Sequence, residues 1–275
     1  MILQALVNGL EATTVSIADR AVLYGDSVFE TVAVRDQKPL LLKEHLDRLS
    51  DGADALSIQY QREALINEIN SLILKHDVSC VLRITVSRGE GGRGYQPDAN
   101  MDGTRILSLH KLPERLQEQR LDGITLGLSS IKLSKQPHLA GHKHSNRIEQ
   151  VLASMELTDE VDEIVMLDTD NRVICGSKSN IFALIDGQWI TPKLSLSGIA
   201  GVMRGKLISL MNEQQISLSE SDSLTTKDIE KAQAVFVSNS LVGIWPVKKY
   251  MNQTLNSMPY CQPVISLLEQ SRCIL

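Results

Sequence analysis

The chain has 275 residues, of which 43% are hydrophobic and 22% are charged, and its glycines and prolines are scattered. This composition is typical of a globular protein with one large or two modest domains, and it excludes collagen-like, coiled-coil and largely disordered chains. The 28 Lys and Arg against 33 Asp and Glu give a net charge of −5, which argues against a nucleic-acid-binding protein because such proteins carry a basic surface.

The sequence contains no apolar run of the ~18 residues that a membrane span needs, so no membrane partner is expected. Its first residues lack the basic and apolar regions of a signal peptide. The four cysteines are widely spaced without a C-x-x-C motif, which favours reduced thiols over a zinc site or disulfides. We therefore expect a cytoplasmic protein.

Strand and helix patterns alternate along the first part of the chain. Period-two alternation predicts a strand over 28–34, and apolar residues on one face predict helices over 46–56 and 65–73. Strands follow over 81–87 and 105–109. The segment 111–120 is polar, contains Pro113 and has no clear period, so we place a linker there.

The second part of the chain repeats this alternation. Strands are predicted over 124–128, 163–167, 180–184 and 234–237, and helices from Asn146, over 201–212 and after Thr225. Asn146 with Glu149, and Thr225 with Asp228, have the spacing of helix caps. We expect an α/β (α+β) chain with a small N-terminal domain over 1–112, an interdomain linker over 113–121 and a large C-terminal domain over 122–275.

The glycine-rich segment Gly89–Gly94 matches the G-x-G-x-x-G pattern of dinucleotide-binding proteins. That function needs a helix at the third glycine and an acidic residue about 20 positions on, whereas Tyr95-Gln96-Pro97 indicates a turn here. We interpret the segment as a hairpin loop that carries Arg93 and Tyr95.

Three histidines flank Lys143 in the segment 137–147. A metal site is disfavoured because the HExxH spacing is absent and Lys143 would place a cation among the ligands. The alternatives are an exposed basic loop and a lysine whose pKa is lowered by its cationic neighbours, which suits Schiff-base chemistry with a carbonyl.

Two further segments have the features of an anion-binding site. Glycines in Gly198–Arg204 precede an apolar helix, so the backbone N–H groups of Val202 and Met203 could bind a phosphate. Ser238-Asn239-Ser240 directly follows a predicted strand and could complete that site.

Together these segments resemble the fold-type IV pyridoxal-phosphate enzymes, which include branched-chain and D-amino-acid aminotransferases and aminodeoxychorismate lyase. The resemblance rests on these segments: Asp19-Arg20, 24–31, 45–49, 141–147 and 198–204. Within the family, segments 87–97 and 137–153 are most similar to the lyase. The resemblance implies a homodimer, a small-molecule substrate and conversion of 4-amino-4-deoxychorismate to 4-aminobenzoate and pyruvate, a step of folate synthesis.

The resemblance also implies roles for individual residues. Lys143 is expected to attach pyridoxal 5'-phosphate covalently and to act as the catalytic base. The residues expected to bind the cofactor with it are Arg48, Cys175, Val202, Met203, Ser238, Asn239 and Ser240. Substrate binding is expected from Thr31, Arg93 and Tyr95, and no metal is implied.

One position departs from the family pattern. Aligned on Asn180, Cys175 stands where the family has a glutamate that pairs with the pyridine nitrogen of the cofactor. A neutral thiol is a weak hydrogen-bond partner and stabilises a protonated ring less well than a carboxylate does. This favours the lyase over the alternative of a D- or branched-chain aminotransferase, and it leaves open a non-catalytic homologue that binds the cofactor.

Overall fold

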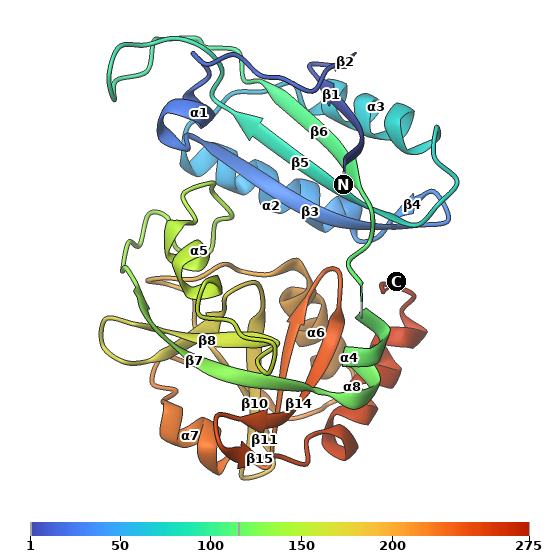
Figure 1. Ribbon diagram of the computed structural model, residues 1–275, viewed down its shortest axis with the longest axis vertical. Helices are drawn as coiled ribbons and strands as arrows, with labels where there is room; N and C mark the ends of the chain where they lie inside the picture. The colour runs from blue at the N-terminus through green and yellow to red at the C-terminus, as the bar shows by residue number, and fades with distance from the viewer. Residues whose placement is uncertain (1, 115, 275) are drawn as a thin grey trace. The chain divides into compact units, whose positions relative to one another are not determined.

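The computed structural model describes residues 2–114 and 116–274 and divides them into two compact units (Figure 1). The first unit comprises the chain up to Pro113 together with His142–Asn146. The second comprises Glu114–Gly141 and Arg147–Ile274. The mixed α/β class predicted from the sequence is confirmed.

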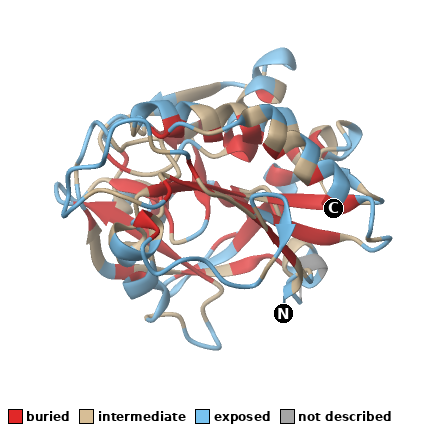
Figure 2. Cartoon of the chain, turned by 90° about the horizontal axis from the view of Figure 1, so that it is seen from above, coloured by how far each residue is buried: buried red, intermediate tan, exposed pale blue. Residues whose placement is uncertain are grey.

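The first unit is built on one antiparallel sheet in the order β2-β1-β6-β5-β3-β4. Its elements are β1 (Ile2–Val7), β2 (Leu10–Glu11), α1 (Arg20–Tyr24), β3 (Ser27–Arg35), β4 (Lys38–Pro39), α2 (Leu42–Ala55), α3 (Arg62–Ile73), β5 (Cys80–Ser87) and β6 (Arg105–His110). Helices α2 and α3 supply buried leucines and isoleucines to one core with the sheet. The strands are largely buried, whereas both helices keep an exposed side (Figure 2).

The second unit contains a mixed sheet in the order β12-β11-β10-β13-β14-β7-β8-β9, with β15 paired to β14. Its strands are β7 (Ile124–Leu133), β8 (Glu163–Asp168), β9 (Val173–Gly176), β10 (Asn180–Ile185), β11 (Gln188–Pro192), β12 (Leu218–Ser221), β13 (Ala234–Asn239), β14 (Gly243–Tyr250) and β15 (Gln253–Thr254). Its helices are α4 (Leu116–Asp122), α5 (Ile148–Ser154), α6 (Val202–Glu213), α7 (Thr226–Lys231) and α8 (Met258–Gln270). On one face of this sheet the buried rings of Phe182 and Phe236 stack with centroids 4.6 Å apart. The other face contributes Ile181, Val235 and Val237 to a hydrophobic core.

Most predicted elements are confirmed, including the capping box of Thr225 and Asp228 at the start of α7. The predicted cap of α5 is wrong, because the N-cap is Arg147 and makes no side-chain capping bond. The Asn146 amide donates to the carbonyl of Gly25, and Glu149 accepts from Ser134. The predicted linker contains most of α4, a short helix whose polar sequence has no apolar stripe.

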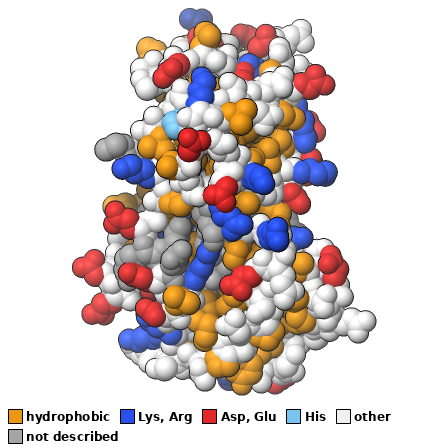
Figure 3. Space-filling model, turned by 90° about the vertical axis from the view of Figure 1, so that its right-hand side faces the viewer, with side chains coloured by type: hydrophobic (Ala, Val, Ile, Leu, Met, Phe, Trp, Pro, Cys, Tyr) orange, Lys and Arg blue, Asp and Glu red, His pale blue; other side chains and the backbone are white. Residues whose placement is uncertain are grey.

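Two further features concern surface charge and helix length. On the face in Figure 3, basic and acidic side chains are interspersed. Among the described residues, no helix is long and apolar enough to span a bilayer.

Candidate active site

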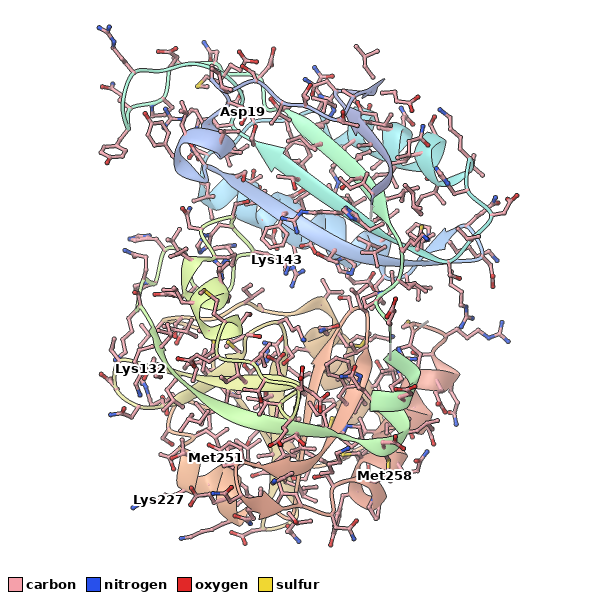
Figure 4. The ribbon with its side chains drawn as sticks, viewed as in Figure 1. Asp19, Lys132, Lys143, Lys227, Met251 and Met258 are labelled. Atoms are coloured by element: carbon pink, nitrogen blue, oxygen red, sulfur yellow. The ribbon has the colours of Figure 1, made fainter. Side chains whose placement is uncertain are left out.

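Lys143 lies on a segment that packs along one edge of β3 in the first unit (Figure 4). The Phe29 N–H donates to the carbonyl of Lys143 over 2.9 Å, and the Ser145 N–H donates to the carbonyl of Ser27 over 2.9 Å. Val28 and His144 form an antiparallel bridge between these two bonds. The backbone at Lys143 is therefore held by a strand rather than carried on an unsupported loop.

The Lys143 side chain lies against an aromatic ring on β3. Its Nζ atom is 4.4 Å from the centroid of the Phe29 ring, and the guanidinium carbon of Arg83 is 4.3 Å from the same centroid. Arg83 on β5 is directly opposite Thr31, and Thr31 faces the same side of the sheet as Phe29. One sheet face thus brings together the lysine amine, a second cation and the predicted substrate residue Thr31.

The opposite face of β3 holds the predicted phosphate ligand Arg48. Its Nε donates to Glu30 Oε1 over 2.7 Å and its Nη2 donates to Glu30 Oε2 over 2.5 Å. His45, one helical turn earlier on α2, bonds to Glu30 through Nδ1 over 2.6 Å. Two successive residues of β3 therefore contact predicted site residues: Phe29 contacts Lys143, and Glu30 bonds to Arg48. The next residue of the strand is Thr31.

The predicted substrate residues Arg93 and Tyr95 lie on an irregular loop of the first unit, and both are exposed. Arg20 holds this loop by donating from Nη1 to the carbonyl of Gly94 and from Nη2 to the carbonyl of Tyr95. No helix begins at Gly94, as the sequence analysis expected. The loop is tethered through its backbone, which leaves the Arg93 and Tyr95 side chains facing solvent.

The residues predicted to form an anion site, Val202 and Met203, lie in the first turn of α6 in the second unit. Its N-cap is Gly201, and a Cβ at that position would overlap the side-chain oxygen of Asn180. The Asn180 amide in turn donates to the carbonyl of Ile199 over 2.9 Å. First-turn N–H groups of a helix have no intrahelical acceptor, so those of Val202 and Met203 can bind an anion.

Ser238 on β13 adds an unpartnered hydroxyl to this part of the unit. It is paired in register with Asn180, so the two side chains share one face of the sheet. Its Oγ atom is buried and has no hydrogen-bond partner among the described protein atoms. Asn239 uses its side-chain oxygen to accept from the N–H groups of Leu241 and Val242, and Ser240 lies half-buried in the turn. A buried hydroxyl without a partner fits a polar ligand at this position.

Cys175 lies on β9 among apolar side chains, with Arg147 and Glu163 close enough to affect it. Burial and the charge of Glu163 raise the pKa of its thiol and the charge of Arg147 lowers it, which leaves a pKa of about 12. The thiol is therefore neutral at physiological pH. Glu163 is fully buried, and its carboxylate accepts hydrogen bonds from Ser177, Lys178 and Ser179.

A family model for class IV amino-transferases matches residues 27–250. The chain belongs to the class IV amino-transferase family. It is 36% identical to the aminodeoxychorismate lyase of Vibrio harveyi, with 88% of this chain and 89% of that protein covered. It superposes on the 4-amino-4-deoxychorismate lyase of Pseudomonas aeruginosa with a TM-score of 0.94 and 36% identity, covering 98% and 99% of the two chains. Escherichia coli branched-chain amino acid aminotransferase shares the fold, with a TM-score of 0.86, 23% identity and 97% and 93% coverage.

The sequence analysis did not single out Glu30, His45 or Arg83. A period-two pattern does place Glu30 in a row with Val28 and Val32, and a charged residue in a buried row is a detectable signal. His45 and Arg48 have helical i, i+3 spacing, which would have paired them on one face. Nothing in the local sequence distinguishes Arg83 from an ordinary exposed arginine.

Proposed function

We propose that this chain is a pyridoxal-phosphate-dependent lyase that converts 4-amino-4-deoxychorismate to 4-aminobenzoate and pyruvate. The observation that carries the proposal is the 36% identity to lyases over nearly the full length of both chains. The matches to branched-chain aminotransferases are more distant, at 29% and 23% identity. The strand-held amine of Lys143 gives the proposal its chemistry.

The residues present fit the cofactor. The first-turn N–H groups of α6 and the unpartnered hydroxyl of Ser238 suit a phosphate-bearing ligand. The phosphate would be bound by Arg48, by the N–H groups of Val202 and Met203, and by the Ser240 hydroxyl, with Ser238 and Asn239 beside them. Lys143 would form the covalent link, and Cys175 would face the pyridine nitrogen as a neutral thiol.

Lys143 has two tasks in this proposal. Bound pyridoxal phosphate supplies an electron-accepting ring that stabilises negative charge beside the substrate amine. The Nζ atom of Lys143, once released from the cofactor, takes the proton from C4 of the substrate ring. The ether bond between the ring and the enolpyruvyl oxygen then breaks, and the ring becomes aromatic. The departing enolpyruvate takes up a proton to become pyruvate, so the reaction needs no oxidant.

The substrate carries two carboxylates, which calls for cationic or phenolic donors. Arg83 supports this requirement because its guanidinium lies on the sheet face of Thr31 and contacts the same Phe29 ring as Lys143. We assign it to the substrate side with Thr31, while Arg93 and Tyr95 on the tethered loop provide a further guanidinium and phenol.

A coupled assay tests the proposal. Purified protein, supplied with 4-amino-4-deoxychorismate by the synthase that makes it, is expected to release equimolar 4-aminobenzoate and pyruvate. Amination of a keto acid by a D- or branched-chain amino acid instead would establish the aminotransferase. A protein that binds the cofactor, with a visible band discharged by borohydride, but catalyses neither reaction would be the non-catalytic homologue.

We further propose a cytoplasmic homodimer. Helix α5 and the residue after it expose an apolar stripe of Ile148, Val151, Leu152 and Met155, which suits a surface covered by a second copy. Sedimentation equilibrium of the wild type and Val151→Glu tests this: the wild type is expected at twice the chain mass and the variant at a reduced association constant. A monomeric wild type would contradict it.

A further inference from the structure

The face of the first-unit sheet that is turned away from α2 and α3 carries positively charged side chains. Its residues alternate along the strands with those of the hydrophobic core and lie in register with one another. Arg83 on β5 lies near the middle of this face, and Arg35 and Lys38 lie at its β4 end. Of the described strand residues on this face, none is an aspartate or a glutamate. The charge of the face therefore favours an anion.

Arg83 is the arginine of this face that lacks a counter-ion. Its guanidinium carbon is 4.3 Å from the centroid of the Phe29 ring. Within the part of the chain that the structure describes, it has no hydrogen-bond acceptor and no acidic partner, whereas Arg20, Arg88 and Arg105 of the same unit all bond to carboxylates. A guanidinium with its donors unused can bind a carboxylate through two parallel hydrogen bonds.

Ser108 and His110 on β6 extend the polar surface beside Arg83. Ser108 is directly opposite Arg83 in one strand pairing and Thr31 is opposite it in the other, so one row crosses three strands. The Cβ atoms of such opposite residues lie about 4.5–5.5 Å apart. Ser108 is buried, and its Oγ atom is 2.8 Å from the Nε2 atom of His110. A guanidinium, two hydroxyls and an imidazole therefore share one patch.

The imidazole of His110 lies within the influence of the Arg83 charge. Burial, the largest cause, lowers the pKa of His110, and the positive charge of Arg83 lowers it as well. His110 is therefore neutral at physiological pH. A neutral imidazole can donate to the Ser108 oxygen, which leaves the Ser108 hydroxyl proton for an acceptor beside Arg83.

The position of Lys143 indicates which carboxylate this patch would bind. The Nζ atom of Lys143 is 4.4 Å from the centroid of the same Phe29 ring, and its segment pairs with the edge of β3 that β5 does not occupy. Neighbouring strands are about 4.8 Å apart, so β6 lies roughly 10 Å beyond β3. The patch is therefore on the far side of β3 from the segment that carries the amine.

The substrate has one carboxylate at a matching distance from the reacting carbon. In the proposed reaction the Lys143 amine takes the proton from C4, the ring carboxylate is on C1 across the ring, and the enolpyruvyl group is on C3 next to C4. We propose that Arg83, Ser108 and His110 bind the ring carboxylate of the substrate, with Thr31 at the near side of the site. This inference rests on the proposed function, which supplies the substrate.

The test compares two ligands that differ in this charge. 4-Aminobenzoate keeps the ring carboxylate of the substrate, and 4-aminobenzamide replaces it with a neutral group of similar shape. Each is titrated into the full-length protein at neutral pH by isothermal titration calorimetry, without turnover. We expect the wild type to bind the carboxylate about tenfold more tightly than the amide, and Arg83→Gln to lose that preference, because hydrogen bonds to charged groups contribute about tenfold or more in affinity.

Further variants test the other members of the site. Arg83→Lys keeps the charge without the paired donors and should keep part of the preference. Ser108→Ala and His110→Leu should each reduce it about two- to fivefold, through weaker binding of the carboxylate alone. Arg62→Gln is the matched control, because Arg62 on α3 bonds to Asp47 on α2, and it should leave both affinities unchanged. Circular dichroism and retained binding of the amide verify that each variant is folded.

Equal affinities of the wild type for the two ligands would overturn the proposal, as would a preference that survives Arg83→Gln. A preference that depends on Arg83 but not on Ser108 or His110 would overturn the part of the site assigned to β6. Neither measurement requires catalysis. Formation of 4-aminobenzoate in the coupled assay therefore decides the lyase activity separately, and a chain without that activity can still show the preference.

Discussion

Each unit of the molecule buries one glutamate completely, and the two are satisfied in different ways. Glu30 in the first unit is paired with the cation of Arg48 and with His45. Glu163 in the second unit accepts from the hydroxyls of Ser177 and Ser179 and from the backbone N–H groups of Ile164, Ser177 and Lys178. Glu163 is thus satisfied by neutral donors within the second unit, whereas Glu30 is bonded to a charged guanidinium and an imidazole.

The largest expected effect tests whether the reactive lysine is in the first unit, which also contains Glu30. Lys143→Ala should abolish turnover and the visible band of the bound cofactor. The circular dichroism spectrum should stay unchanged, because the segment is held on β3 by backbone hydrogen bonds that the substitution leaves in place. Lys132→Ala is the matched control, since Lys132 on β7 of the other unit bonds to Asn171 (Figure 4). If Lys132→Ala loses the band instead, the assignment of the cofactor to Lys143 is wrong.

Glu163 should behave as a structural residue. Glu163→Ala removes an acceptor from the hydroxyls of Ser177 and Ser179 and from the N–H groups of Ile164, Ser177 and Lys178, and each buried group left unpaired costs about 1–3 kcal/mol. We expect a loss of about 3 kcal/mol in the free energy of unfolding, measured by urea titration. The exposed Glu160→Ala is the control and should be neutral. A neutral Glu163→Ala would remove the contrast between the two glutamates.

Acid should remove the stabilisation that ionised Glu30 provides. The pKa of Glu30 falls from an ordinary 4.5 to about 2 on folding, so its stabilisation is fully present above pH 4.5 and is lost as the pH falls toward 2. A shift of this size corresponds to about 3 kcal/mol. Urea midpoints measured from pH 5 to pH 2.5 should fall more steeply for the wild type than for Glu30→Gln. Parallel slopes would show that the buried carboxylate does not carry this stability.

The smallest expected effect concerns Cys175, which lies near both Glu163 and Arg147. Cys175→Glu would introduce a third buried glutamate, close to the charge of Arg147. Because aromatisation drives the lyase reaction and nothing comparable drives transamination, we predict a larger gain in side transaminase activity than in lyase activity. Cys175→Gln, which has the same shape without the charge, should show neither gain. A large lyase gain with unchanged transamination would contradict the prediction.

Sequence reasoning recovers the parts of this protein that depend on local patterns. The apolar stripes of α2 and α3 and the cap of α7 are all readable from residue spacing. Helix α4 could not be predicted because its sequence has no apolar face. The predicted cap at Asn146 is wrong because its side-chain amide donates to the carbonyl of Gly25, which is distant in sequence. The same limit applies to the site, although Lys143 and Arg48 lie in recognisable segments. Lys143 reaches β3 through a pairing across more than 100 residues. Arg48 reaches it through an ion pair between α2 and Glu30.

The membership of His142–Asn146 in the first unit has a consequence for the order of folding. On a ribosome, β1 to β6 emerge before the segment that completes the edge of β3, and roughly thirty residues of the second unit are made in between. Such non-local pairing forms late because the intervening chain must first be closed into a loop. The sheet of the first unit can therefore form before Lys143 is made. Lys143 pairs with β3 only after synthesis of the second unit has begun.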